Sequence, residues 1–215
     1  ISDMMNKFYN NIKFFIQRVF YNKIKIQKKN KLVVSECLMK KNNIQIFGSN
    51  NNLKINAGSR IENLYIKIKG KNNSLVIEEK CQILSGKINI IGDGLIFLIG
   101  NNTTIREFDS VLVGDNKSIS IGSDCMLGSN IKIWNGELHP IYSVSNKKRL
   151  NNAESIDIGD HVWIGSDVIV LKGSKISAGS VVGLRSLVKG KVEKNTLVVG
   201  SPARQIRKNI EWKRS

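Results

Sequence analysis

A period of six residues governs the C-terminal part of this 215-residue chain. Aliphatic residues recur at six-residue intervals without a slip, at Ile158, Ile164, Val170, Ile176, Val182 and Val188. This period matches neither an amphipathic helix, which repeats every ~3.6 residues, nor an alternating strand, which repeats about every two. It matches a chain that turns a corner after each short flat face and points one aliphatic side chain inward per face.

Glycines mark the corners of the expected coils. Gly159, Gly165 and Gly183 directly follow three of the aliphatic positions, where a residue without Cβ adopts corner dihedrals at little cost. Three faces close a triangular coil of about 18 residues, and successive coils stack as parallel strands about 4.8 Å apart. The sequence therefore predicts an all-β solenoid in which each coil completes the core of its neighbours.

The same period extends toward the N-terminus in a looser form. Ile121, Leu127 and Ile133 keep the phase, and residues 33–133 contain short alternating runs of isoleucine and leucine separated by Asn, Gly and Ser turns. We expect less regular coils of the same solenoid here, with roughly eight coils in all.

Charge and cysteine usage limit the class of protein. The formal charge of +17 favours anionic partners such as phosphates, acidic glycans, nucleic acid or an anionic membrane face. The alternative is that the many lysines reflect the base composition of the genome.

The three cysteines, Cys37, Cys81 and Cys125, are isolated and have no CxxC spacing. They indicate neither a disulfide framework nor a metal site, and they fit a reducing compartment.

The N-terminal segment, residues 1–31, is predicted to be helical and basic. Apolar residues fall at helical spacing over residues 3–22 and a lysine-rich stretch follows. This helix either lies on an anionic membrane surface or packs on the protein itself. No continuous apolar run resembles a secretory signal, and none is long enough to span a bilayer. The expected location is the cytoplasm, at the inner face of the membrane if the helix binds lipid.

One segment interrupts the period and is expected to form an extended loop at about residues 134–157. Residues 134–143 read WNGELHPIYS and contain His139, one of two histidines in the chain. An imidazole titrates near neutral pH and can accept or donate a proton. His139 is therefore a candidate functional residue, and a structural turn histidine is the alternative.

The repeats, the loop and the C-terminal end together resemble a known family. The [Ile/Val/Leu]-Gly-x4 units, HPIY, GDHVWIG and the stretch VGSPAR at 199–204 are similar to the hexapeptide-repeat acyltransferases. Among these, the chain most resembles the O-acetyltransferases of bacterial capsule and surface glycans, including the polysialic acid O-acetyltransferases. The resemblance is strongest over residues 117–210. It implies a left-handed parallel β-helix over residues 32–203, a homotrimer with active sites between subunits, acetyl-CoA as cosubstrate and no metal.

The resemblance also implies how the reaction runs. Acetyl would pass directly from acetyl-CoA to a glycan hydroxyl, with His139 as base. Glu137 stands where the family has an acidic residue that orients the histidine and stabilises imidazolium, as in triads; a solvated loop carboxylate is the alternative. Trp163 would border the active site, donating to the oxyanion or packing on acceptor or pantetheine, with core packing as the alternative. His161, two residues earlier, is interpreted as structural or as a pocket-lining donor.

The remaining candidate site residues form two sets. Positions that match the family's CoA groove are Gly165, Ser166, Ser180, Lys189 and Arg204. Residues of the loop region expected to contact the acceptor are Trp134, Asn135, Tyr142, Lys147 and Arg149. The basic side chains of the second set suit the carboxylate of a sialic acid.

The C-terminal tail, residues 204–215, is expected to cap the solenoid. Ile206, Ile210 and Trp212 stand at helical spacing and predict a short helix. A cap of this kind would cover a sheet edge that otherwise invites pairing with other chains.

Other functions of the same fold explain less of the sequence. A hexapeptide-repeat carbonic anhydrase needs three histidines around zinc, and the chain has two in all. An amino-sugar N-acetyltransferase uses the same fold and histidine and remains the main enzymatic alternative. A non-catalytic solenoid that binds partners or nucleic acid does not explain why the HPIY loop and the GSPAR end occur together. The sequence therefore favours an O-acetyltransferase acting on sialic acid or a sialic-acid-containing capsule or lipooligosaccharide, with no nucleic-acid partner.

Overall fold

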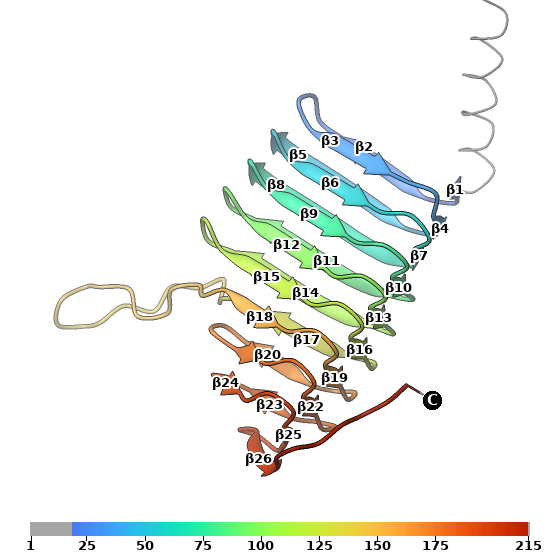
Figure 1. Cartoon of the computed structure of the whole chain (residues 1–215). Helices are drawn as coiled ribbons and strands as arrows, with labels where there is room; N and C mark the ends of the chain where they lie inside the picture. The colour runs from blue at the N-terminus through green and yellow to red at the C-terminus, as the bar shows by residue number, and fades with distance from the viewer. Residues whose placement is uncertain (1–18, 215) are drawn as a thin grey trace, which may run out of the picture.

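Residues 19–214, which the computed structural model describes, form a three-sided parallel β-solenoid (Figure 1). We name its sides sheets A, B and C. Sheet A contains, in order, β1 (Val19–Phe20), β4 (Leu38–Lys40), β7 (Arg60–Glu62), β10 (Gln82–Ile83), β13 (Thr104–Ile105), β16 (Met126–Leu127), β19 (Trp163–Ile164), β22 (Val181–Val182), β25 (Leu197–Val199) and β26 (Arg204–Arg207). Sheet B contains β2 (Lys23–Ile26), β5 (Asn43–Ser49), β8 (Leu64–Lys71), β11 (Gly86–Ile91), β14 (Phe108–Val113), β17 (Ile131–Trp134), β20 (Ile169–Leu171) and β23 (Leu187–Val188). Sheet C contains β3 (Lys31–Val34), β6 (Asn52–Ile55), β9 (Ser74–Ile77), β12 (Ile96–Ile99), β15 (Ser118–Ile121), β18 (Ile156–Ile158), β21 (Lys175–Ile176) and β24 (Lys191–Val192).

The chain visits the three sheets in turn, so each coil lays one strand on each side of the prism. Sheets B and C each have eight strands, which confirms the predicted solenoid of about eight coils. Neighbouring strands pair in parallel throughout, except where β26 meets β25.

Coil length differs between the two ends of the solenoid. Ile164 pairs with Val182, 18 residues further on, as the period-six pattern predicts. In the N-terminal coils, however, Ile61 and Ile83 are partners at a separation of 22 residues. The extra length lies mainly in the strands: β8 spans eight residues and β20 only three. Alternating isoleucines such as Ile66 and Ile68 point two aliphatic side chains inward from one longer face, so the coils of this half differ from the regular 18-residue coil, as expected, and are longer.

The interior is a column of aliphatic side chains stacked in register. In sheet B, Ile44, Ile66 and Ile88 lie in line, and each is at most 1% exposed. Burying one such side chain contributes about 1.5–3 kcal/mol. A single coil has open ends, so this contribution is realised only when a neighbour stacks on each side.

Corner residues also stack from coil to coil. At the corner where the chain passes from sheet C to sheet A, left-handed backbone conformations recur at Lys80, Asn102, Asp124, His161, Gly179 and Asn195. The amide of each donates to a carbonyl one coil earlier, for example Asp124 N to Asn101 O at 2.7 Å and His161 N to Ser123 O at 2.8 Å. We call this line the C/A corner. The backbone of His161 is therefore part of the solenoid frame.

The solenoid begins before residue 32, where the sequence placed its start. β1 and β2 pair with β4 and β5, so residues 19–31 already belong to the first coil. Pairing there satisfies backbone groups along the edge of the second coil. The helix expected over residues 3–22 lies almost entirely outside the described residues, and Val19–Phe20 at its end are strand. No helix among residues 19–214 is long and apolar enough to cross a bilayer.

The C-terminal helix expected over residues 204–215 is not observed in the part of the tail that the structure describes. β26 pairs antiparallel with β25, and residues 208–214 run back along the solenoid without regular secondary structure (Figure 1). The last strand of a sheet offers unpaired backbone groups. An added strand satisfies these groups, whereas a single helical turn would leave them open. β26 thus covers the end of sheet A.

Glycine is required where two corners nearly touch. Gly70 has φ +135°, and a Cβ at this position would overlap the carbonyl oxygen of Gly92 one coil further on. We expect Gly70→Ala to lower the free energy of unfolding by about 3 kcal/mol or more, because strain and overlap add. The control is Gly190→Ala, which has φ +94° but open space around the added atom; it should cost about 1–2 kcal/mol. Denaturant titrations followed by circular dichroism measure both, and equal losses would contradict the stacking argument.

Candidate active site

The interruption of the period forms one long loop between sheets B and C. β17 ends at Trp134 and β18 begins at Ile156, and Figure 1 shows the intervening loop standing away from the prism. The loop folds back on itself: Leu150 N donates to Ile141 O at 2.7 Å and Ser143 N to Lys148 O at 2.9 Å. It is therefore an ordered arm.

Asn151 fixes the backbone around the candidate base. This side chain is 6% exposed; its Oδ1 accepts from Ile141 N at 2.7 Å and its Nδ2 donates to His139 O at 2.8 Å. The amide thus holds the two sides of the arm together at His139. The imidazole of His139 is exposed and makes no hydrogen bond or ion pair with any other residue between 19 and 214. It is free to meet a substrate.

Glu137 does not contact His139, although the sequence suggested that it orients the ring. Lys172, which follows β20 on the next coil, donates from Nζ to Glu137 Oε2 at 2.8 Å. This ion pair holds the pKa of Glu137 below its ordinary value. Within this chain, the carboxylate anchors the base of the arm to the next coil.

Asn135 is part of the frame rather than of an acceptor surface. It is fully buried, and its amide exchanges two hydrogen bonds with the backbone of Val113, at 2.7 and 3.0 Å. The other residues expected to meet the acceptor are exposed. Trp134 ends β17, Tyr142 pairs with Arg149 across the arm, and Lys147 lies at its tip.

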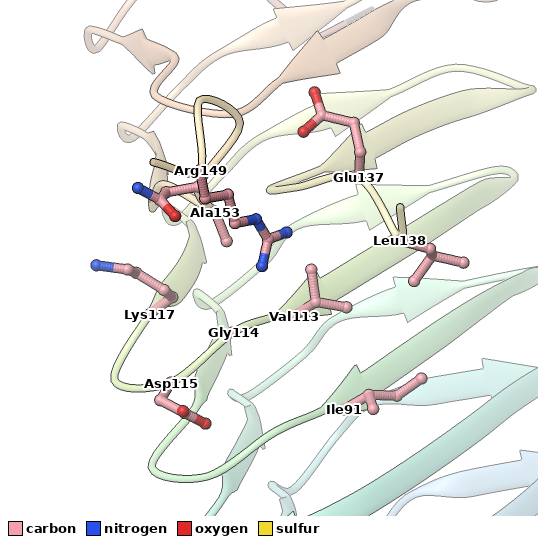
Figure 2. A pocket seen from close by; sticks show the side chains of 10 residues that line it. Ile91, Val113, Gly114, Asp115, Lys117, Glu137, Leu138, Arg149 and Ala153 are labelled. Carbon is pink, nitrogen blue, oxygen red and sulfur yellow. The ribbon is translucent and has the colours of Figure 1, made fainter. Parts of the chain in front are cut away.

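A cavity of about 520 Å³ lies beside the root of the arm. Its walls come from β11, β14, the turn after β14 and the arm; the lining residues are Ile91, Val113, Gly114, Asp115, Lys117, Glu137, Leu138, Arg149, Asn152 and Ala153. Figure 2 shows the guanidinium of Arg149 extending over Val113 and Gly114. Leu138, the neighbour of His139 in the chain, closes one side. The cavity thus combines two basic side chains, two carboxylates and apolar walls next to the candidate base.

Trp163 lies on the opposite side of the prism from the arm. It is in β19 of sheet A, paired with Met126 and Val181, and its side chain is 40% exposed. The arm leaves at the corner between sheets B and C, and sheet A is the side of the triangle that faces away from that corner (Figure 1). One chain therefore does not bring His139 and Trp163 together.

The CoA set is only partly accessible. Ser180 is buried and its hydroxyl donates to Glu193 O at 2.7 Å, so it supports the coil. Gly165 is required by its own neighbours, since a Cβ would lie 2.9 Å from Leu184 N. Ser166 Oγ accepts from Ser129 N at 3.1 Å. Lys189 and Arg204 are exposed on the last coil and at the end of sheet A.

The Cys125 thiol is not available as a nucleophile. Cys125 is buried, its Sγ lies 3.1 Å from Gly159 O, and burial raises its pKa to about 11. A thiolate nucleophile there is scarce at neutral pH. Among residues 19–214, no three His, Cys, Asp or Glu side chains are grouped to hold a metal ion.

Comparison with known proteins gives the family. No protein-family profile matches the sequence. The chain is 32% identical over 146 residues to the polysialic acid O-acetyltransferase of Neisseria meningitidis, covering 59% of this chain and 68% of that protein. Two crystal structures agree over nearly the whole chain. The polySia-specific acetyltransferase NeuO is 32% identical with a TM-score of 0.84, covering 91% of this chain and 89% of NeuO. The polysialic acid O-acetyltransferase OatWY is 30% identical with a TM-score of 0.84, covering 92% of each.

The chain belongs to the hexapeptide-repeat acyltransferases. As a member of this family it is an acetyl-CoA-dependent O-acetyltransferase built on a left-handed β-helix, as its repeats, HPIY loop and GSPAR end predicted. The fold and enzyme class expected from the sequence are thereby confirmed.

Several residues that shape this candidate site carry no recognisable signal in the sequence. Asn151 contacts His139, 12 positions away, and Lys172 contacts Glu137, 35 positions away. No local sequence motif indicates such contacts. The tail residues Trp212 and Arg214 lie against the C/A corner. Helical spacing in the tail pointed to a different conformation.

Loss of the Asn151 amide should loosen the arm without unfolding the solenoid. Asn151→Ala removes both hydrogen bonds that clamp His139 and Ile141, worth about 1 kcal/mol each. We expect proteolytic cleavage within residues 137–150 to become about tenfold faster, while the thermal midpoint of the solenoid stays unchanged. Limited proteolysis with mass spectrometry measures the rate, and Asn146→Ala near the tip of the arm is the control. Equal cleavage rates in Asn151→Ala and wild type would contradict the clamp.

Proposed function

We propose that this acyltransferase acetylates a hydroxyl of a bacterial surface glycan that contains sialic acid, with His139 as the general base. The observation that carries the proposal is the agreement over nine-tenths of the chain with two acetyltransferases specific for polysialic acid. Sequence and structure add an exposed histidine on an ordered arm beside a cavity that holds Arg149.

The chemistry needs one proton carrier. The imidazole of His139 takes the proton of the acceptor hydroxyl as its oxygen attacks the thioester carbonyl of acetyl-CoA. The tetrahedral intermediate collapses, the carbon–sulfur bond breaks, and the imidazolium returns the proton to the leaving thiolate. The products are the acetyl ester and CoA, and no acyl-enzyme forms. The imidazole of His139 is exposed, so an acceptor hydroxyl can reach it directly.

A complete site requires a second chain. The arm with His139 and the face with Trp163 point to different sides of one prism (Figure 1), so we propose a homotrimer in which His139 of one subunit meets Trp163 of the next. A three-fold arrangement places the sheet A face of each subunit beside a neighbour's B/C corner. Exposed apolar side chains of sheet A and the turns next to it, Leu38, Leu84, Trp163 and Leu184, give that face an apolar contact surface.

The CoA groove in this arrangement runs between subunits along sheet A. Lys189 and Arg204 are exposed near the end of the solenoid, and such cations suit the phosphates of CoA. Gly165 and Ser166 follow β19 at the corner between sheets A and B, where their backbone groups would contact the pantetheine arm. Because acetyl-CoA is a cytoplasmic metabolite, we expect the enzyme to act in the cytoplasm.

The cavity at the root of the arm is the proposed acceptor site. Arg149 presents a planar guanidinium, which binds carboxylates in a bidentate manner, and Lys117 adds a second positive charge. A sialic acid carboxylate on these groups would hold the sugar hydroxyls next to Leu138 and His139. The exposed Trp134, Tyr142 and Lys147 would extend the contact to neighbouring sugars.

The segment expected to contact membrane, residues 1–31, retains exposed Lys23 and Lys25 in its described part. We propose that this segment makes peripheral contact with the membrane.

Substitution of the base tests the reaction. We expect His139→Ala to lower CoA-thiol release with a sialylated glycan about a hundredfold or more, without change in circular dichroism or oligomer size. Ser145→Ala, elsewhere on the arm, should retain wild-type turnover. A His139→Ala enzyme with near wild-type turnover would contradict the assignment.

The acceptor screen distinguishes the ester from an amide. Sialylated, neutral and amino-sugar glycans are compared in the same thiol-release assay, and the product is treated with mild alkali. We expect turnover with the sialylated glycan and a product that loses acetyl in alkali. An alkali-stable product formed on an amino sugar would instead identify an N-acetyltransferase.

A further inference from the structure

The last residues of the chain form a strap along the C/A corner. We define the strap as residues 208–214. Ile210 N donates to Asn195 O at 3.0 Å at the coil of β25. At the other end, Arg214 donates to Thr104 Oγ1 at 3.0 Å and to Asn102 O at 3.2 Å at the coil of β13. Seven residues thus run past five successive coils and hydrogen-bond with four of them, those of β25, β19, β16 and β13, far beyond what capping sheet A requires.

Trp212 docks in the middle of the strap onto His161. The two rings are stacked with centroids 4.1 Å apart and planes 8° apart, and Trp212 Nε1 donates to His161 O at 2.9 Å. Trp212 is only 7% exposed. Its ring centroid also lies 6.2 Å from that of Trp163, at an interplanar angle of 46°. The strap therefore forms one wall beside the Trp163 indole.

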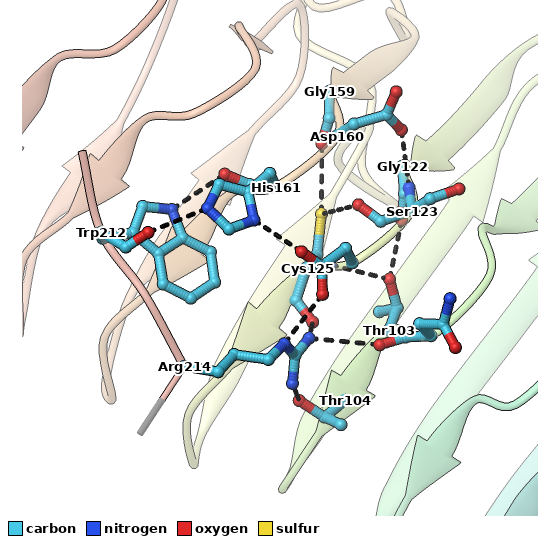
Figure 3. Close-up of polar contacts among 12 residues, drawn as sticks. Thr103, Thr104, Gly122, Ser123, Cys125, Gly159, Asp160, His161, Trp212 and Arg214 are labelled. Carbon is cyan, nitrogen blue, oxygen red and sulfur yellow. Dashed lines mark hydrogen bonds and ion pairs between the residues drawn. The ribbon is translucent and has the colours of Figure 1, made fainter. Parts of the chain in front are cut away.

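Asp124 joins the strap to the histidine. Its Oδ2 lies 2.6 Å from His161 Nδ1, and its Oδ1 accepts from Arg214 Nε at 2.9 Å. Figure 3 labels His161 and Arg214, the two residues that this carboxylate joins. Arg214 also donates to Cys125 O at 2.7 Å. One carboxylate is thus shared between a corner residue and the end of the strap.

Both nitrogens of the His161 ring face acceptors. Nδ1 faces the Asp124 carboxylate, and Nε2 lies 3.0 Å from the Trp212 carbonyl oxygen. A neutral imidazole has a single N–H and can satisfy only one of them. An imidazolium can donate to both, so the geometry matches a doubly protonated ring.

We propose that the strap is a pH-sensitive latch, held by doubly protonated His161, that positions Trp163 at the edge of the active site. His161, Asp124 and Trp212 are then positioning residues, since they act through Trp163. The role of Trp163 rests on the proposed function, whereas the latch itself does not.

The charges around His161 set the direction of the switch. Asp124 and Asp160 are the nearby carboxylates and Arg214 the nearby cation. Burial alone would lower the pKa of His161, but the bonds to Asp124 and to the Trp212 carbonyl outweigh it and hold that pKa above its ordinary value, while Arg214 opposes them. For Asp124, burial would raise the pKa, but the bonds from His161 and Arg214 outweigh it and lower that pKa.

These two shifts define the pH window of the latch. A raised His161 pKa stabilises the closed strap fully below the unfolded pKa of histidine, about 6.5, and the contribution is lost as pH rises through the folded value. The lowered pKa of Asp124 stabilises the strap above the unfolded pKa of aspartate, about 3.9, and this contribution is lost in stronger acid. The strap is therefore closed in mildly acidic solution and opens in alkaline solution.

Two measurements on the full-length protein test the latch. Imidazole carbon signals of ¹³C-histidine report the pKa of His161, because the chain has only two histidines and His139→Ala assigns them. The protection factor of the Trp212 indole N–H reports strap opening after correction for the intrinsic effect of pH. In wild type we expect His161 to titrate above its ordinary value and the protection factor to fall at least tenfold across that titration.

Two variants should shift the His161 pKa in opposite directions. A cluster with only a structural role would not show such opposite shifts. Asp124→Asn should lower the His161 pKa and keep Trp212 poorly protected at all pH values. Arg214→Gln should raise the His161 pKa, because it removes a cation whose charge opposes protonation of the ring. Asp157→Asn, an exposed aspartate in β18, is the matched control and should leave both values unchanged. A Trp212 protection factor that stays constant between pH 5.5 and 8.5 in wild type would overturn the latch.

The link to Trp163 has its own readout. With a glycan that the wild type acetylates, Asp124→Asn should lower kcat below pH 7 and converge with wild type above the His161 titration, where both straps are open. Parallel pH profiles would overturn the positioning role. If no glycan is acetylated by wild type, the proposed function fails, and the histidine titration and indole exchange still decide the latch.

Discussion

Each coil of this protein depends on its neighbours for its core and for its backbone hydrogen bonds. A triangular coil encloses one thin layer of side chains, and its strands satisfy their backbone groups only through the coils above and below. Register is therefore fixed along the whole molecule, from the Ile44, Ile66 and Ile88 column to the C/A corner. A substitution at one corner disturbs the neighbouring corner, because corners such as Gly70 and Gly92 are in direct contact.

A rigid prism of this kind places chemical groups by topology alone. The arm leaves at the B/C corner, so His139 is carried away from sheet A of its own chain, while Trp163 stays on that sheet. Local contacts then fix the surroundings of each residue. Asn151 and Lys172 hold the arm that carries His139, and the strap borders Trp163. The shared site that we propose would explain why both His139 and Trp163 are exposed in one chain.

The sequence predicted the features that follow from the six-residue repeat. It did not predict features that depend on contacts between distant parts of the chain. Period-six aliphatics from Ile158 to Val188 located the core, the corners and the place where the arm must leave. The 22-residue coils were missed because a second inward isoleucine, as in Ile66 and Ile68, lengthens a face without breaking the pattern. Glu137 was paired with the wrong partner because Lys172 is brought beside it only by stacking. The tail was expected to be helical, yet the open edge at β25 and the C/A corner determined its conformation.

The central claim is that His139 and Trp163 act together only across two chains, and complementation between inactive subunits tests it most directly. Differently tagged His139→Ala and Trp163→Ala chains are co-expressed, and trimers that contain both are purified. Each mixed trimer has one interface where an intact His139 meets an intact Trp163, so thiol release should recover to about a third of the wild-type rate. Mixed trimers no more active than either parent would contradict the shared site.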